Sequence, residues 1–107
     1  MLDEKTAIKR DYLKSYRVLL AKIRRFTEMA DINPENAEKY KQRITLARKQ
    51  RDAIEEKIDR VDGSILSEIL SQKYICGKSF EEIAYNMCYS KRQVERLHLK
   101  ALCELCI

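Results

Sequence analysis

Apolar residues recur with helical spacing along most of the chain, and the places where the spacing stops divide it into five predicted helices. The first helix runs from about Glu4 to Ala30, and the second from about Pro34 to Val61. The link Asp31-Ile32-Asn33-Pro34 separates them, with Asn33 as a suitable N-cap and Pro34 at the preferred first helical position. The stripe of the first helix is Tyr12, Tyr16, Leu19, Ile23, Phe26 and Ala30, and that of the second is Tyr40, Ile44, Ala47, Ile54, Ile58 and Val61.

The spacing of these stripes resembles a heptad repeat, which is typical of helices that pack side by side. Both helices are predicted to have about 28 residues, and a short connection favours antiparallel packing. Arg51 falls on the second stripe. Residues 1–63 are therefore predicted to form a long, coiled-coil-like helical hairpin.

Three shorter helices are predicted over residues 64–107, which we expect to form a second domain. The first of them runs from about Ile65 to Ile75, after Asp62-Gly63-Ser64 and before Gly77. The next two are predicted at about Phe80 to Met87 and Lys91 to Cys106. Only Cys88 and Tyr89 stand between Met87 and the cap of the last helix.

Ser79 and Ser90 are predicted to cap these last two helices through their hydroxyl oxygens. Glu82 and Gln93 follow three residues later, which predicts two capping boxes. Ala84 is small where the two helices must cross. Two amphipathic helices joined by so short a turn indicate a helix-turn-helix, whose second helix can enter the DNA major groove. The alternative is an ordinary helical hairpin of a bundle.

The segment that carries this pattern reads KYICGKSFEEIAYNMCYSKRQVERLHLKAL. It resembles region 4 of bacterial sigma-70 factors, and more closely the sigma-region-4-like phage proteins that include late transcription activators of the RinA and ArpU type. The resemblance covers about the last 40 residues without an internal gap. It implies a three-helix DNA-binding unit. Its base-reading positions fall on Lys91, Arg92, Glu95 and Arg96, where the residue types differ from those of sigma factors.

The predicted recognition helix presents a charged outer face of Lys91, Arg92, Glu95, Arg96 and Lys100. An arginine can hold guanine O6 and N7 with a bidentate fork, whereas a lysine serves phosphates without choosing a sequence. Further predicted DNA contacts are the helix starts at Ser79 and Ser90, where a phosphate is favoured, and Tyr85 on the outer face of the preceding helix.

The chain of 107 residues has a net charge of +5, which suits a polyanionic partner. Residues 1–63 hold 16 basic and 12 acidic side chains, and residues 64–107 hold 6 and 5. The excess in the first half either adds contacts to the DNA backbone or keeps long helices soluble.

No apolar run is long enough to span a membrane, and residues 1–10 lack the apolar centre of a signal peptide, so we expect a cytoplasmic protein without a membrane partner.

The apolar stripes of the hairpin are wider than one partner helix can cover, since Leu13, Leu20 and Leu46 lie beside them. A homodimer through residues 1–63 is the simplest prediction, because DNA-reading helices usually work in pairs. The alternative is a monomer in which the hairpin folds back onto the third helix.

Four cysteines and His98 raise the possibility of a zinc site, because Cys103 and Cys106 have CxxC spacing. Cys88 is expected to pack in the turn and Cys103 to point outward, so the ligands would not converge, and we predict no metal and reduced thiols. His98 has no evident acidic partner, and no phosphate-binding loop or catalytic triad is present. We predict neither a cofactor nor an enzyme.

The sequence therefore predicts an all-α, sequence-specific DNA-binding transcription regulator of phage or prophage type. Its recognition helix spans about residues 91–106. A first alternative is a sigma-like module that docks on RNA polymerase without reading DNA itself. A second is a DNA-binding accessory of packaging or replication.

Overall fold

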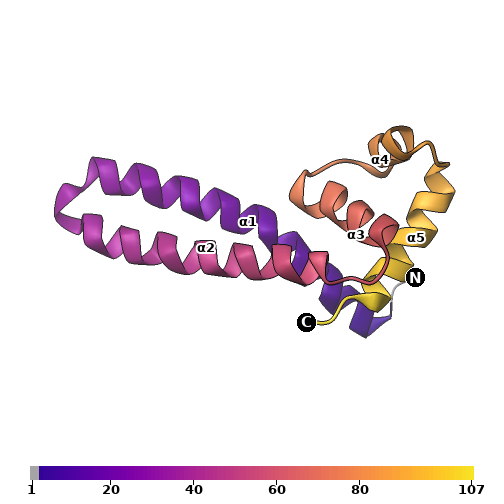
Figure 1. The fold of residues 1–107 in the computed structure, drawn as a ribbon. Coiled ribbons are helices and arrows are strands. Elements are labelled where there is room, and N and C mark those ends of the chain that lie inside the picture. Colours follow the sequence, from indigo (N-terminus) through magenta and orange to yellow (C-terminus); the bar gives the residue numbers. More distant parts are fainter. Residues whose placement is uncertain (1–2) are drawn as a thin grey trace.

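The computed structural model describes residues 3–107, which are all-helical and include no strand. An elongated molecule of 52 × 26 × 24 Å results from one long helical hairpin that projects from a compact group of shorter helices (Figure 1). The α-helices are α1 (Glu4–Ile32), α2 (Ala37–Asp59), α3 (Ser64–Leu70), α4 (Phe80–Met87) and α5 (Lys91–Glu104). The predicted number of five helices is confirmed, as are the breaks at Asn33, Gly63, Gly77 and Cys88-Tyr89.

Helices α1 and α2 run antiparallel and pack along their apolar stripes (Figure 1). The prediction of equal lengths is wrong, because α1 has 29 residues and α2 has 23. Pro34 begins a short 3-10 turn, Pro34–Asn36, instead of α2 itself, and α2 ends at Asp59. Asn33 accepts no hydrogen bond with its side chain at this turn. Toward the open end of the hairpin, the Tyr16 hydroxyl donates to Glu55 Oε1 at 2.9 Å.

The third predicted helix is divided into two parts. Helix α3 ends at Leu70, and a π-helical turn, Ser71–Ile75, continues it. Helix α3 begins at Ser64, one residue earlier than predicted, and Gly63 holds the N-cap position with φ at +103°, a backbone conformation that favours glycine. Gly77 follows the π-helical turn with φ at +72°, and Arg17 of α1 donates to the Ile75 carbonyl oxygen at 3.0 Å. The Arg17 guanidinium satisfies a carbonyl group that is free at the end of the π-helical turn, and it links the hairpin to this turn.

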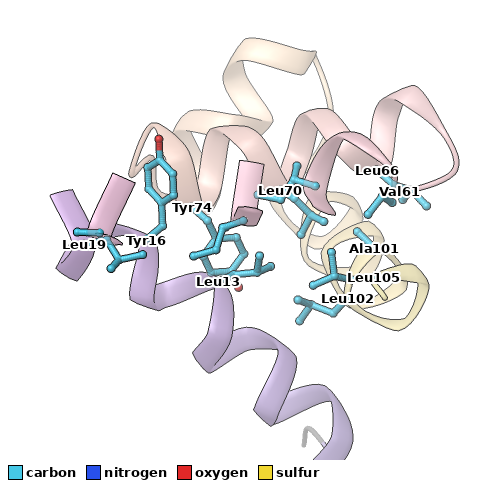
Figure 2. Close-up of a cluster of buried hydrophobic side chains, with 13 residues drawn as sticks. Leu13, Tyr16, Leu19, Val61, Leu66, Leu70, Tyr74, Ala101, Leu102 and Leu105 are labelled. Carbon is cyan, nitrogen blue, oxygen red and sulfur yellow. The ribbon is translucent and has the colours of Figure 1, made fainter. Parts of the chain in front are cut away.

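The larger hydrophobic core joins the hairpin to the C-terminal helices (Figure 2). Leu13 and Tyr16 of α1 meet Leu70, Tyr74 and Leu102 there. We expected Leu13 to stay exposed to solvent unless a second chain covered it, but it is fully buried within this chain. The reason is that α1 extends past the end of α2 and packs beside α5 (Figure 1). The core thus draws side chains from both predicted domains.

A smaller core holds α4 against α3 and α5. Its buried members are Ile69, Ile83, Ala84 and Val94. Ala84 therefore lies at the contact between α4 and its neighbours, as its small size predicts. This core fixes the position of α4 relative to the first turn of α5, where the candidate DNA contacts begin.

Candidate nucleic-acid interface

Helices α4 and α5 are joined by the three residues Cys88, Tyr89 and Ser90. Cys88 has φ at +59°, and the Tyr89 amide donates to the Ala84 carbonyl oxygen at 3.0 Å, which closes the end of α4. The prediction that Cys88 packs in this turn is wrong: it is exposed, because the residue that follows a helix in the left-handed conformation projects away from it. The short link leaves α4 and α5 in a fixed relation.

The two predicted capping boxes differ in the structure. At α4 the box is complete, because Ser79 Oγ accepts from the Glu82 amide at 3.2 Å and Glu82 Oε1 accepts from the Ser79 amide at 3.2 Å. At α5, Ser90 Oγ accepts from the Gln93 amide at 3.1 Å, but the Gln93 side chain does not bond to the Ser90 backbone amide. The prediction of a second capping box is therefore wrong.

This difference separates the two predicted phosphate positions. The first turn of α4 carries two carboxylates, Glu81 and Glu82, which oppose an anion near Ser79. The first turn of α5 has no acidic residue and begins with Lys91 and Arg92 after Ser90. The start of α5 is therefore the more favourable of the two for a phosphate.

The outer face of α5 presents Arg92 and Arg96, which are both exposed. Within residues 3–107, neither guanidinium lies in an ion pair or donates a side-chain hydrogen bond. Leu99 and Cys103 continue the same face, and Leu99 is 44% exposed. Two unpaired guanidinium groups can hydrogen-bond to base edges, and the apolar side chain beside them can contact a thymine methyl group. Sequence reasoning missed Leu99, although its spacing of seven from Arg92 places it on that face.

Lys91 belongs to a cross-helix ion pair that the sequence pattern did not indicate. Its Nζ lies 2.9 Å from Glu81 of α4 and 3.8 Å from Glu95 one turn along α5. The hydrogen bond to Lys91 lowers the pKa of Glu81, and the same bond raises the pKa of Lys91. Glu95 thus lies within ion-pair distance of Lys91, one turn along the same helix.

Lys100 lies one turn beyond Arg96, at one edge of the Arg92–Arg96 face, and Tyr85 lies on α4. Lys100 is exposed but lines a surface hollow with Asp62 and Glu104, at the edge of α5 that faces the start of α3. Tyr85 is 86% exposed on α4, beside Glu81 and Glu82. The structure therefore brings Ser90, Arg92 and Arg96 together on one surface, with Lys91 engaged beside them.

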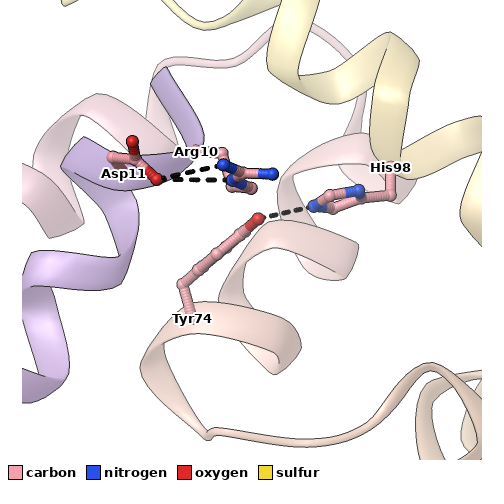
Figure 3. Close-up of polar contacts among 4 residues, drawn as sticks. All are labelled: Arg10, Asp11, Tyr74 and His98. Atoms are coloured by element: carbon pink, nitrogen blue, oxygen red, sulfur yellow. Dashed lines mark hydrogen bonds and ion pairs between the residues drawn. The ribbon is translucent and has the colours of Figure 1, made fainter. Parts of the chain in front are cut away.

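Behind this face, His98 is buried and shares a hydrogen bond of 2.7 Å with the Tyr74 hydroxyl (Figure 3). Burial lowers the pKa of His98 to about 4, with smaller contributions from Lys73 and Arg10, and burial raises the pKa of Tyr74 to about 12. His98 is thus a neutral core residue that anchors α5. The signal that we missed is the spacing of Val94, His98 and Leu102, which lie four residues apart on the buried side.

The four cysteines are free and exposed. Among the described residues, no three His, Cys, Asp or Glu side chains gather in a way that could hold a metal ion. None of the helices that the structure describes has the length and apolar character needed to span a membrane.

Comparison of the chain with protein-family models, curated proteins and solved structures found no match. The resemblance to sigma region 4 therefore stays a prediction from the residues.

Proposed function

We propose that the chain is a sequence-specific DNA-binding transcription regulator in which α4 and α5 act as a helix-turn-helix. The observation that carries this proposal is the pair of exposed, unpaired guanidinium groups, Arg92 and Arg96, on one face of a rigidly anchored helix. Helix α5 is held from behind by Val94, His98 and Leu102, so its outer face is free to enter a major groove. The net charge of +5 supports a nucleic-acid partner. The phage or prophage origin rests on the resemblance alone.

Binding measurements on substituted chains test this proposal. Arg92→Ala or Arg96→Ala should each cost about 1–3 kcal/mol on a preferred duplex and relax the preference at particular base pairs. Lys100→Ala should weaken all duplexes alike and reduce the salt slope by about one. Lys91→Ala should reduce the slope by less, because Lys91 is already paired with Glu81 and Glu95. Fluorescence anisotropy on a preferred duplex and a scrambled copy separates these effects. If the Arg92→Ala/Arg96→Ala variant bound both duplexes as the parent does, the assignment of α5 as the recognition helix would fail.

The second candidate is a module that docks on RNA polymerase. It is favoured by the outer face of α4, where Tyr85 is exposed beside Glu81 and Glu82. Carboxylates there oppose DNA phosphates, whereas an exposed tyrosine is a common anchor of protein interfaces. The test is the substitution Tyr85→Ala. Loss of polymerase binding with unchanged duplex binding would support this second role.

We also propose a homodimer through residues 1–63, which now rests on fewer residues because Leu13 is buried within the chain. Leu20 is half-buried against the core, whereas Leu46 remains 60% exposed. Val18 is a further exposed residue, at 54%, and it borders a hollow of about 350 Å³ between α1 and α2. Covering such side chains gains apolar burial. Light scattering at tens of micromolar should give twice the chain mass for the parent and less for Val18→Glu. A parent that scatters as a single chain would refute the dimer.

A further inference from the structure

A groove of about 380 Å³ lies between α1, the π-helical turn and α5, at the joint of the hairpin and the C-terminal helices. Three cations line it: Arg10 and Lys14 from α1, and Lys73 from the π-helical turn. Arg10 lies 3.3 Å from Asp11, its neighbour in the chain, and Lys73 Nζ lies 4.3 Å from the centre of the Phe80 ring. Within residues 3–107, neither Lys14 nor Lys73 forms an ion pair.

Two of these cations act on the buried imidazole of His98. The Arg10 side chain reaches from α1 toward Tyr74 and His98 (Figure 3). Both Lys73 and Arg10 lower the pKa of His98 by their positive charge. Like charges that line one groove repel each other, and an anion in the groove would relieve that repulsion.

The α5 side of the groove belongs to the candidate recognition helix. Glu95, His98 and Leu99 line it, and Leu99 also continues the face that carries Arg92 and Arg96. The single carboxylate of the groove, Glu95, lies 3.8 Å from Lys91 Nζ, which offsets its charge. The groove therefore borders the predicted base-reading surface directly.

The opposite edge of α5 has the reverse balance of charge. There Lys100 lines a hollow with two carboxylates, Asp62 and Glu104. The groove at one edge of α5 is thus lined by three cations and one carboxylate, with Asp11 beside Arg10, and the hollow at the other edge is lined by one cation and two carboxylates.

A helix of 10–12 Å diameter fills a major groove about 12 Å wide, so the sugar–phosphate backbones run along both of its edges. From this geometry and the charge balance, we propose that one DNA backbone lies along the groove between α1 and α5, held by Arg10, Lys14 and Lys73. The long hairpin then belongs to the DNA-binding surface. This inference rests on the proposed function, and it adds to it a phosphate-binding site that the predicted contacts leave out.

The test compares the full chain with Lys14→Gln/Lys73→Gln. A labelled duplex of mixed sequence and about 30 base pairs is sufficient, because phosphate contacts do not depend on sequence. Affinity is measured by anisotropy over a series of salt concentrations. The control is Lys39→Gln/Lys49→Gln, which removes the same charge from exposed positions of α2. Melting temperatures of both variants show that each chain is folded.

We expect the salt slope of Lys14→Gln/Lys73→Gln to fall by about two and its affinity to weaken roughly 10- to 30-fold, alike on all duplexes. The control should bind as the parent does. If Arg92→Ala/Arg96→Ala weakens binding but Lys14→Gln/Lys73→Gln keeps the parent's slope, this inference fails while the proposed function stands, and an acidic protein segment becomes the better occupant of the groove. If the parent binds no duplex at all, both fail.

Discussion

Replacing Leu13 with alanine is expected to destabilise the whole chain by about 2–5 kcal/mol, the usual cost of emptying a fully buried leucine site. Leu13 is 0% exposed and belongs to the core that joins α1 to the C-terminal helices (Figure 2). Its removal leaves a cavity next to Leu70, Tyr74 and Leu102. These three buried residues belong to α3, the π-helical turn and α5. The effect therefore reports on the joint between the hairpin and the candidate DNA-binding unit.

Urea unfolding at neutral pH measures this cost. Leu46→Ala is the matched control, because it makes the same change at a leucine of α2 that is 60% exposed. The control should stay within about 0.5 kcal/mol of the parent in free energy of unfolding. Equal losses for the two variants would mean that α1 does not pack on the C-terminal helices.

Acidification is expected to destabilise the chain through His98. The pKa of this imidazole is about 4 in the fold, against an ordinary value of 6.5. The unfolded chain therefore binds more protons between those pH values, so stability falls as the pH drops below about 6.5. At 1.36 kcal/mol for each pKa unit, this group removes about 3 kcal/mol by pH 4.

The variant His98→Gln isolates this effect from the titration of carboxylates. It keeps a polar group near the Tyr74 hydroxyl but carries no charge at any pH. Free energies of unfolding at a series of pH values from 7 to 4 should fall more steeply for the parent than for the variant. The two curves should differ in total drop by about 3 kcal/mol. Parallel curves would show that His98 is not held neutral in the fold.

The helix boundaries near Asn33, Gly63 and Gly77 could be predicted because they depend on local chemistry. A proline, a glycine at positive φ or a capping serine acts on the backbone beside it, whatever the rest of the chain does. The same holds for the Ser79–Glu82 capping box, which the structure contains in full. The start of α2 was predicted three residues early, because Pro34 fits the first position of a 3-10 turn as well as that of an α-helix.

The partners of the buried faces could not be predicted in the same way. Periodicity tells which residues of a helix lie on one side, but not which element covers them. Leu13 therefore looked like a dimer contact until α1 was seen to extend beside α5. His98 looked unused because a polar residue on a buried stripe is identified only when its partner, here Tyr74 from another element, is known.

The same distinction between local spacing and packing of separate elements applies to the candidate site. The exposure of Arg92 and Arg96 followed from helical spacing on a single helix. The pairing of Lys91 with Glu81 and the groove that brings Arg10 and Lys14 beside α5 both depend on the packing of separate helices. Charges from distant parts of the chain are therefore what the structure adds to the predicted interface.

Selection of bound duplexes from a random pool by the full chain is the most direct test of the central claim, that α5 reads DNA sequence. The parent is predicted to enrich a common motif, and the Arg92→Ala/Arg96→Ala variant to lose that enrichment at particular base pairs while keeping salt-dependent binding. Recovery of unenriched DNA by the parent, or the same motif from both proteins, would contradict the claim.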